Sequence, residues 1–192
     1  ALGGAAAFGP GMARLARACG GFTAESDASV RIGQIQIVDV ADPDRTVQLL
    51  EDARGEIDAF AREVHPRLVP RGGGYRGFEI RRRTYDEPGF PREEMVVVHV
   101  LLDCVDAMGA NMLNTLAEQL APTVEEVTGQ PIGLRILSNL ADRRKTRAQV
   151  RIEPRLLGTD VHDGREVVEA IAQAWRFAWV DPYRAATHNK GV

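Results

Sequence analysis

The sequence predicts an α+β protein whose antiparallel sheet carries helices on one face. Strand and helix patterns alternate between residues 31 and 138 in the order β-α-β-β-α-β. Each pattern has its own start and stop signals, such as a capping aspartate, a proline or a glycine. This order is typical of the split βαβ, ferredoxin-like arrangement, which packs two helices against one face of the sheet.

The first strand and helix of this segment lie between residues 30 and 66. Residues 30–40 are rich in β-branched side chains and are expected to form a strand. Asp42 and Pro43 follow, as an N-cap and a proline at the first helical position. Apolar residues then recur at helical spacing, which predicts a single helix that ends at Pro66.

Two further strands and a second helix complete the segment. Residues 75–84 and 95–102 are expected to be strands joined by a hairpin loop that holds two prolines and a glycine. The strand over 95–102 is apolar on both faces, which favours a central place in the sheet. A helix over 112–127 and a strand over 131–137 follow.

The sequence on either side of this segment is expected to belong to a second domain. Residues 1–30 and 139–192 flank the segment 31–138 and have different patterns. The simplest organisation inserts 31–138 into a larger α/β domain, which is incomplete in this sequence. The first residue is Ala1 and not Met, which suggests an internal point of a longer chain, or a processed or trimmed end.

The flanking sequence contains three recognisable elements. Small and apolar residues predict a helix over 11–19, stopped by two glycines. A short alternating pattern predicts a strand over 148–153. Asp163 is expected to cap a helix with a broad apolar face.

The composition excludes several classes of function. The chain has 192 residues, of which 44% are hydrophobic and 27% charged, as in ordinary soluble proteins. A net charge of -3 gives no general attraction to nucleic acid or to an anionic membrane. No apolar run approaches the roughly 20 residues of a membrane span. Cys19, Cys104 and the four histidines show neither disulfide nor zinc spacing, which suits a reducing, cytoplasmic compartment.

The segment 106–111, called here the 106–111 turn, is the first candidate site. It joins the most apolar strand to the strongest helical pattern, and a helix N-terminus attracts anions through its unpaired N–H groups and its dipole. Gly109 would let a ligand approach the backbone, and Asp106 could cap the helix or bind a ribose hydroxyl. The alternative is structural, with Asp106 as an N-cap and Gly109 as a packing glycine.

The last residues of the chain form a second candidate site. Arg184 can hold a carboxylate through two hydrogen bonds, and Lys190 can stabilise an oxyanion. Asn139 stands where a buried amide could reach a crevice between domains. The alternatives are a solvated tail for residues 181–192 and a simple turn asparagine at 139.

The chain has two basic runs, of which the first could contact a nucleotide phosphate. Arg76 and residues 81–83 place arginines along one expected strand, and the alternative to phosphate contact is a solvated edge strand protected by charge. The other run, residues 143–145, is expected to be a solvated turn.

Several stretches together resemble the hydroxymethylglutaryl-CoA reductases, in their soluble class II form. Residues 106–118 are similar to the dinucleotide-binding motif of that family. Residues 135–142, 147–152 and 181–191 are similar to the family in the same order, and residues 15–22 also fit. The resemblance therefore covers almost the whole chain.

The resemblance implies an NAD(P)-binding domain inserted into a substrate domain. It implies a homodimer or higher even oligomer with its active site at the subunit interface. The reaction is the interconversion of hydroxymethylglutaryl-CoA with mevalonate plus CoA by two hydride transfers, a step of isoprenoid metabolism. Lys190 matches the catalytic lysine and Asn139 an active-site asparagine. Arg184 matches the arginine that holds the substrate carboxylate, and Asn189 is assigned to substrate binding on the same match.

The cofactor implied by the resemblance is NAD(H) or NADP(H). The residues that match the nucleotide site are Asp106, Met108, Gly109 and Asn111. NAD-using members usually carry an acid where this chain has Gly77, and such an acid would bind ribose hydroxyls and repel a 2′-phosphate. With Gly77 in that place and Arg76 beside it, use of NADPH becomes a hypothesis.

Three catalytic groups of the family are absent from the sequence. The glutamate belongs before the first residue, and the aspartate and the histidine belong beyond Val192. None of the four histidines in the chain lies in a matching motif. The alternative function is therefore a non-catalytic nucleotide-binding or regulatory module that keeps the motif without the chemistry.

Overall fold

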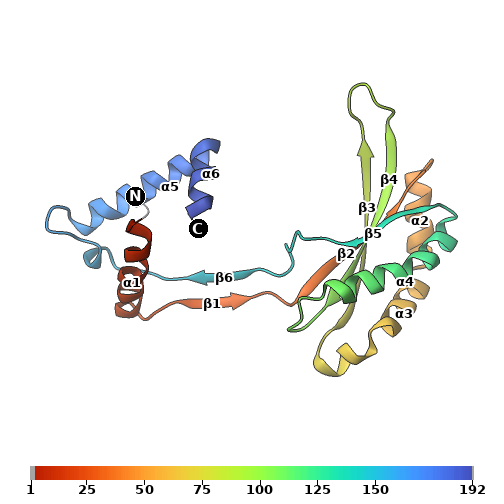
Figure 1. Cartoon of the computed structure of the whole chain (residues 1–192), viewed down its shortest axis with the longest axis horizontal. Coiled ribbons are helices and arrows are strands. Elements are labelled where there is room, and N and C mark those ends of the chain that lie inside the picture. The colour runs from red at the N-terminus through yellow and green to blue at the C-terminus, as the bar shows by residue number, and fades with distance from the viewer. Residues whose placement is uncertain (1–2, 192) are drawn as a thin grey trace. The chain divides into compact units, whose positions relative to one another are not determined.

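The computed structural model describes the backbone of residues 3–191 and the side chains of residues 11–188. The chain forms two compact units: a central unit of residues 26–146, and a flanking unit of residues 1–25 and 147–192. The chain leaves and re-enters the flanking unit along β1 (Thr23–Ser26) and β6 (Thr146–Gln149), which pair in a two-stranded sheet (Figure 1).

The central unit is built on a four-stranded antiparallel sheet in the order β3-β4-β2-β5. The strands are β2 (Val30–Ile37), β3 (Gly74–Tyr85), β4 (Glu93–Asp103) and β5 (Ile132–Leu137). The α+β class with an antiparallel sheet is confirmed. Val98 of β4 faces Ile35 of β2 on one side and Ile80 of β3 on the other, so the most apolar strand is an inner strand.

Three helices pack on one face of this sheet and enclose the core (Figure 1). They are α2 (Pro43–Asp52), α3 (Arg54–Val64) and α4 (Ala110–Thr128). Alternate residues of β4 point to this face because side chains alternate along a strand. The fully buried side chains that meet there include Val96, Val98, Val100, Leu50, Ile57, Leu113, Leu116 and Leu120. Each contributes about 1.5–3 kcal/mol through the apolar surface it removes from water.

The single helix predicted up to Pro66 is wrong, because the chain breaks it at Ala53. Ala53 ends α2 and precedes α3, with φ −88° and ψ 5°. The guanidinium of Arg54 lies 4.0 Å from the centre of the Phe78 ring, and its Nη1 donates to the Phe78 carbonyl. Gly55 follows and weakens helix propensity at the same point. These contacts with β3 accompany the break between α2 and α3. The spacing of apolar residues along the sequence does not reveal them, because they involve a distant residue.

The flanking unit is mainly helical. It contains α1 (Gly3–Ala18), a short 3₁₀ helix η2 (Pro154–Leu156), α5 (Gly164–Val180) and α6 (Pro182–Gly191). The cap predicted at Asp163 is confirmed, because its carboxylate accepts from the backbone of Arg165 while Glu166 accepts from the backbone of Asp163. This reciprocal arrangement is a capping box.

Three expectations for this unit need correction. The helix predicted over 11–19 begins earlier, at Gly3, because the alanine-rich residues before it favour helix. The strand predicted over 148–153 lies at Thr146–Gln149, where it pairs with β1, a strand that the sequence analysis missed. The solvated tail considered for residues 181–192 is helical as far as Gly191.

Within the described residues, no helix combines the length and the apolar character needed to cross a membrane. The same residues contain no cluster of three or more histidine, cysteine or acidic side chains that could hold a metal ion.

Candidate functional site

Five segments of the central unit meet at one end of its sheet. The strand register places Asp103, at the end of β4, opposite both Val30 and Gly74 at the starts of β2 and β3. Leu137, at the end of β5, faces Gly33 on β2. The 106–111 turn leaves β4 at this end and leads into α4. Sequence segments that are far apart therefore converge around the turn.

Val105, the residue before the turn, has a conformation that β-branched residues avoid. Its φ of 55° lies in the left-handed region, where such a residue costs about 1–3 kcal/mol. Two side chains fix its peptide groups: Asp103 Oδ1 accepts from Val105 N at 3.0 Å, and Ser29 Oγ donates to the Val105 carbonyl. Backbone strain that is held in this way is characteristic of ligand-binding and catalytic sites.

Gly109, and not Asp106, is the N-cap of α4. The helix begins at Ala110, so Asp106 lies too far back along the chain to accept from its first N–H groups, and its capping interpretation is wrong. Gly109 has φ 84°, and a Cβ there would collide with Cys104 Sγ and lie 2.9 Å from Cys104 Cβ. No side chain caps α4, which leaves its first N–H groups open to a ligand.

The other residues assigned to the nucleotide site surround this helix end. Asp106 and Asn111 are exposed, and Met108 is 69% exposed although it is a large apolar side chain. An exposed methionine beside open N–H groups offers an apolar contact next to an anion site. The structure therefore brings together the four residues that the sequence assigned to this turn.

Arg76 is also at this end of the sheet, and its guanidinium is already paired. Its Nη2 donates to the Gly72 carbonyl at 2.7 Å and to Asp103 Oδ2 at 3.1 Å. The sequence analysis did not single out Asp103; its only signal was an acid at the end of an apolar strand. Gly77, one residue further, has φ 109° at a β-bulge between Tyr75 and Gly77.

Arg144 and Arg31 lie close to the turn and were not assigned a role from the sequence. Arg144 Nη1 donates to the Ala107 carbonyl at 3.3 Å, so the solvated turn predicted for 143–145 in fact contacts the site. Arg143 pairs with Glu79 at 2.5 Å. Arg31 Nε is buried and has no hydrogen-bond partner among the described residues.

The thiol beneath the turn is not a reactive group. Burial raises the pKa of the Cys104 thiol, and the positive charges of Arg31 and Arg144 offset this only in part. Since the thiolate is the nucleophilic form, Cys104 packs against Gly109 as a small apolar residue.

Asn139 follows β5 at the same end of the sheet. Its neighbours are fixed: Ser138 N donates to the Ile32 carbonyl at 2.8 Å, and Leu137 N donates to Asn114 Oδ1 at 3.1 Å. Asn139 itself lies on an exposed bend, as the turn alternative expected. Its amide is available to a ligand rather than used in the core.

The residues assigned to the substrate lie on α6, in the flanking unit. Arg184 N donates to Asp181 Oδ1 at 2.6 Å, which caps the helix. The Arg184 side chain is half-buried, and no described residue forms an ion pair with it. The backbone of Asn189 and Lys190 belongs to α6, while their side chains lie outside the described residues.

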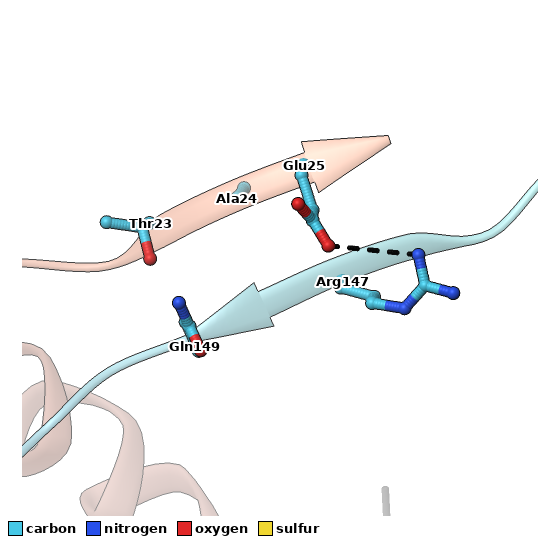
Figure 2. Close-up of a pocket in the computed structure, with 5 residues that line it drawn as sticks. All are labelled: Thr23, Ala24, Glu25, Arg147 and Gln149. Atoms are coloured by element: carbon cyan, nitrogen blue, oxygen red, sulfur yellow. Dashed lines mark ion pairs between the residues drawn. The ribbon is translucent and has the colours of Figure 1, made fainter. Parts of the chain in front are cut away.

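A shallow pocket of the flanking unit holds none of the assigned residues. Its lining comes from Thr23, Ala24 and Glu25 on β1 and from Arg147 and Gln149 on β6 (Figure 2). Glu25 Oε1 and Arg147 Nη1 are 3.8 Å apart across the two strands. An exposed ion pair of this length is weak and offers no acid, base or nucleophile in a defined position.

These observations define a class of protein. It is an α+β protein in which a strained strand end and a glycine turn lead to a helix N-terminus that no side chain caps. The sequence matches the model of the family described as hydroxymethylglutaryl-coenzyme A reductase over residues 6–192. It is 42% identical over 180 residues to the 3-hydroxy-3-methylglutaryl-coenzyme A reductase of Archaeoglobus fulgidus, an alignment that covers 94% of this chain and 39% of that protein. A probable reductase of Borreliella burgdorferi is 26% identical over 145 residues, covering 76% of this chain and 32% of that protein.

Solved structures give the same result. The 3-hydroxy-3-methylglutaryl-coenzyme A reductase of Streptococcus pneumoniae superimposes with a TM-score of 0.79 at 38% identity, over 92% of this chain and 46% of that chain. A structure of the class II enzyme from the same organism, bound to NADPH in open conformations, also has a TM-score of 0.79, at 39% identity over 92% of this chain and 41% of that chain. The chain belongs to the hydroxymethylglutaryl-coenzyme A reductase family, as predicted, and spans less than half the length of these relatives.

Proposed function

We propose that the protein to which this chain belongs is a hydroxymethylglutaryl-CoA reductase. It would interconvert hydroxymethylglutaryl-CoA with mevalonate plus CoA, using a nicotinamide cofactor as the hydride carrier. The observation that carries the proposal is the 106–111 turn, an uncapped helix N-terminus in a chain that is 42% identical to an archaeal reductase.

The cofactor half of the site belongs to the segment 31–138. The sheet order β3-β4-β2-β5, with helices on one face, supports a ferredoxin-like NAD(P)-binding domain inserted between substrate-domain segments 1–30 and 139–192. The open N–H groups of α4 would bind the pyrophosphate, because a helix N-terminus favours negative charge. Gly109 allows the close approach, and Asp106, Met108 and Asn111 would contact the rest of the nucleotide.

The preferred cofactor in this proposal is NADPH. Gly77 stands where an acid would repel a 2′-phosphate, and a Cβ built on it would meet no atom within 4 Å. Arg76, the residue before Gly77, has a half-exposed guanidinium. A class II reductase that is 39% identical to this chain has a structure bound to NADPH, which supports the proposed use of NADPH here.

The substrate half of the site would be supplied by α6 and Asn139. Arg184 would bind the substrate carboxylate, for which its half-buried guanidinium has capacity, and Asn189 would assist it. Lys190 would donate to the carbonyl oxygen and stabilise the negative charge that develops there when the hydride arrives. Asn139, which matches an active-site asparagine of the family, would contribute its amide. The arrangement proposed for the whole protein is a cytoplasmic homodimer, or a higher even oligomer, with the site at the subunit interface.

The test is an assay of the protein made from the complete reading frame. Hydroxymethylglutaryl-CoA with NADPH or NADH should give mevalonate and free CoA, with two dinucleotides oxidised per product, and the reverse reaction should reduce NADP⁺ or NAD⁺. If the protein binds either dinucleotide but shows no turnover in either direction, the result would support the non-catalytic module and refute the reductase.

A further inference from the structure

One buried carboxylate, Asp103, joins two parts of the proposed cofactor site. Its Oδ1 accepts from Val105 N at 3.0 Å, and its Oδ2 accepts from Arg76 Nη2 at 3.1 Å. The residue is 8% exposed and faces Gly74 across the sheet. A single side chain therefore fixes Val105, the residue before the 106–111 turn, and the arginine near the start of β3.

The two contacts of Asp103 have different consequences. The contact with Val105 N shapes the backbone and needs only a hydrogen-bond acceptor. The contact with Arg76 also brings a negative charge to a half-exposed guanidinium on the residue that precedes Gly77. An opposite charge at this distance weakens the attraction of Arg76 for any second anion.

This electrostatic effect distinguishes the two nicotinamide cofactors. A phosphate monoester carries about −1.5 to −2 charges near pH 7, and NADPH has one on its adenosine ribose. NADH has hydroxyl groups in that place and the same pyrophosphate. A change of charge at the Asp103–Arg76 pair therefore alters the binding of NADPH more than that of NADH, whereas a distorted backbone would affect both.

We propose that Asp103 is a positioning residue that sets the cofactor preference, because it holds Arg76, the residue before Gly77, in a neutral ion pair. The inference rests on the proposed reductase function. It identifies the ion pair, rather than Arg76 alone, as the group that meets the adenosine ribose. The net charge of the Asp103–Arg76 pair then determines how strongly the site prefers NADPH to NADH.

The test uses three variants of the full-length protein: Asp103→Asn, Arg76→Met and the double variant. Asp103→Asn keeps an acceptor for Val105 N and leaves Arg76 with an uncompensated positive charge. We expect the KM for NADPH to fall about fivefold to tenfold relative to the KM for NADH, with kcat little changed. Arg76→Met leaves an uncompensated carboxylate, so the KM for NADPH should rise by a similar factor relative to the KM for NADH. The double variant restores a neutral pair and should return to the wild-type ratio.

Equal changes of both KM values in Asp103→Asn would overturn the inference, since a merely structural carboxylate affects both cofactors alike. The inference would also be overturned if both single variants changed the ratio of the two KM values in the same direction. If Asp103→Asn does not fold, Asp103→Ser replaces it in the test, because a serine hydroxyl can still accept from Val105 N while the negative charge beside Arg76 is removed. A wild-type protein that turns over neither dinucleotide would refute the proposed function itself, which is a different result from an unchanged ratio in an active enzyme.

Discussion

Arg144 donates a hydrogen bond from Nη1 to the carbonyl of Ala107, at 3.3 Å. This contact ties the loop that follows Asn139 to the 106–111 turn, so two segments assigned to different halves of the proposed site touch each other. The loop is also fixed further on, where the backbone N–H of Lys145 donates to Asp27 Oδ2.

Arg144→Met should loosen the turn without unfolding the unit. A hydrogen bond from a charged donor contributes about 1.5–3 kcal/mol when buried and less at a half-exposed position such as this one. We expect amide hydrogen exchange in residues 105–109 to become about threefold to tenfold faster, while exchange in the middle of α4 stays the same. Lys145→Met is the matched control, because Lys145 is exposed and its contacts with Asp27 use its backbone. Equal acceleration in the control would show that the loop charge, and not the Ala107 contact, stabilises the turn.

Gly109→Ala should cost much more folding free energy than Gly129→Ala. Both glycines flank α4, with φ 84° and 67°, so both substitutions pay the left-handed penalty of about 1–2 kcal/mol. At Gly129 the new methyl meets no atom within 4 Å, whereas at Gly109 it collides with Cys104 Sγ. Overpacking of this kind adds about 1–3 kcal/mol. Urea unfolding of both variants measures the difference, and equal losses would mean that Cys104 moves aside without cost.

The order of the elements could be predicted from the sequence because periodicity and capping residues are local signals. Residues 31–138 show the alternation clearly, and Asp163 marks the start of α5 as expected. The break at Ala53 could not be predicted, since it depends on the contact of Arg54 with Phe78, 24 positions away in the sequence. Likewise, β1 has little pattern of its own and forms because β6 pairs with it.

The candidate site was predicted in part, and for a similar reason. The 106–111 turn has a recognisable strand–glycine–helix pattern, but Asp103 and Arg144 reach it only through the register of the sheet and the path of the loop. The left-handed conformation of Val105 is contrary to its intrinsic preference, so no propensity could reveal it. Lys190 and Arg184 were singled out by their chemistry, but their roles came from resemblance to a family, since those roles depend on a substrate.

His99 should make the central unit less stable in acid. Burial lowers the pKa of the His99 imidazole, and the positive charge of Arg81 lowers it further, while Glu79 opposes the shift. Gln34 Nε2 lies 3.0 Å from His99 Nε2; because an amide nitrogen only donates, the ring must accept there, in its neutral form. The unfolded chain keeps the ordinary pKa of about 6.5 and takes up the proton first as the pH falls. The free energy of unfolding should therefore decrease as the pH falls below about 7, until the folded-state pKa is passed.

The pH effect can be isolated by comparison with His99→Gln, which keeps a neutral hydrogen-bonding side chain opposite Gln34. Urea midpoints measured at about pH 7.5 and about pH 5.5 should differ less in the variant than in the wild type. Identical pH dependence in both proteins would assign the acid sensitivity to other groups.

Lys190→Ala should abolish turnover in the full-length protein while leaving cofactor binding intact. The proposed role of Lys190 is to donate to the substrate oxygen on which negative charge develops, and loss of one such donor lowers kcat by about 100-fold to 1,000-fold. The nucleotide contacts proposed for the 106–111 turn belong to another segment of the chain, so the dissociation constant of NADPH should change little. Lys145→Ala is a suitable control, because the chain contains only these two lysines and Lys145 has no proposed role in the reaction. A Lys190→Ala protein that keeps wild-type kcat would exclude the lysine from the mechanism; a parallel loss of NADPH binding would show that α6 supports the cofactor site rather than the chemical step.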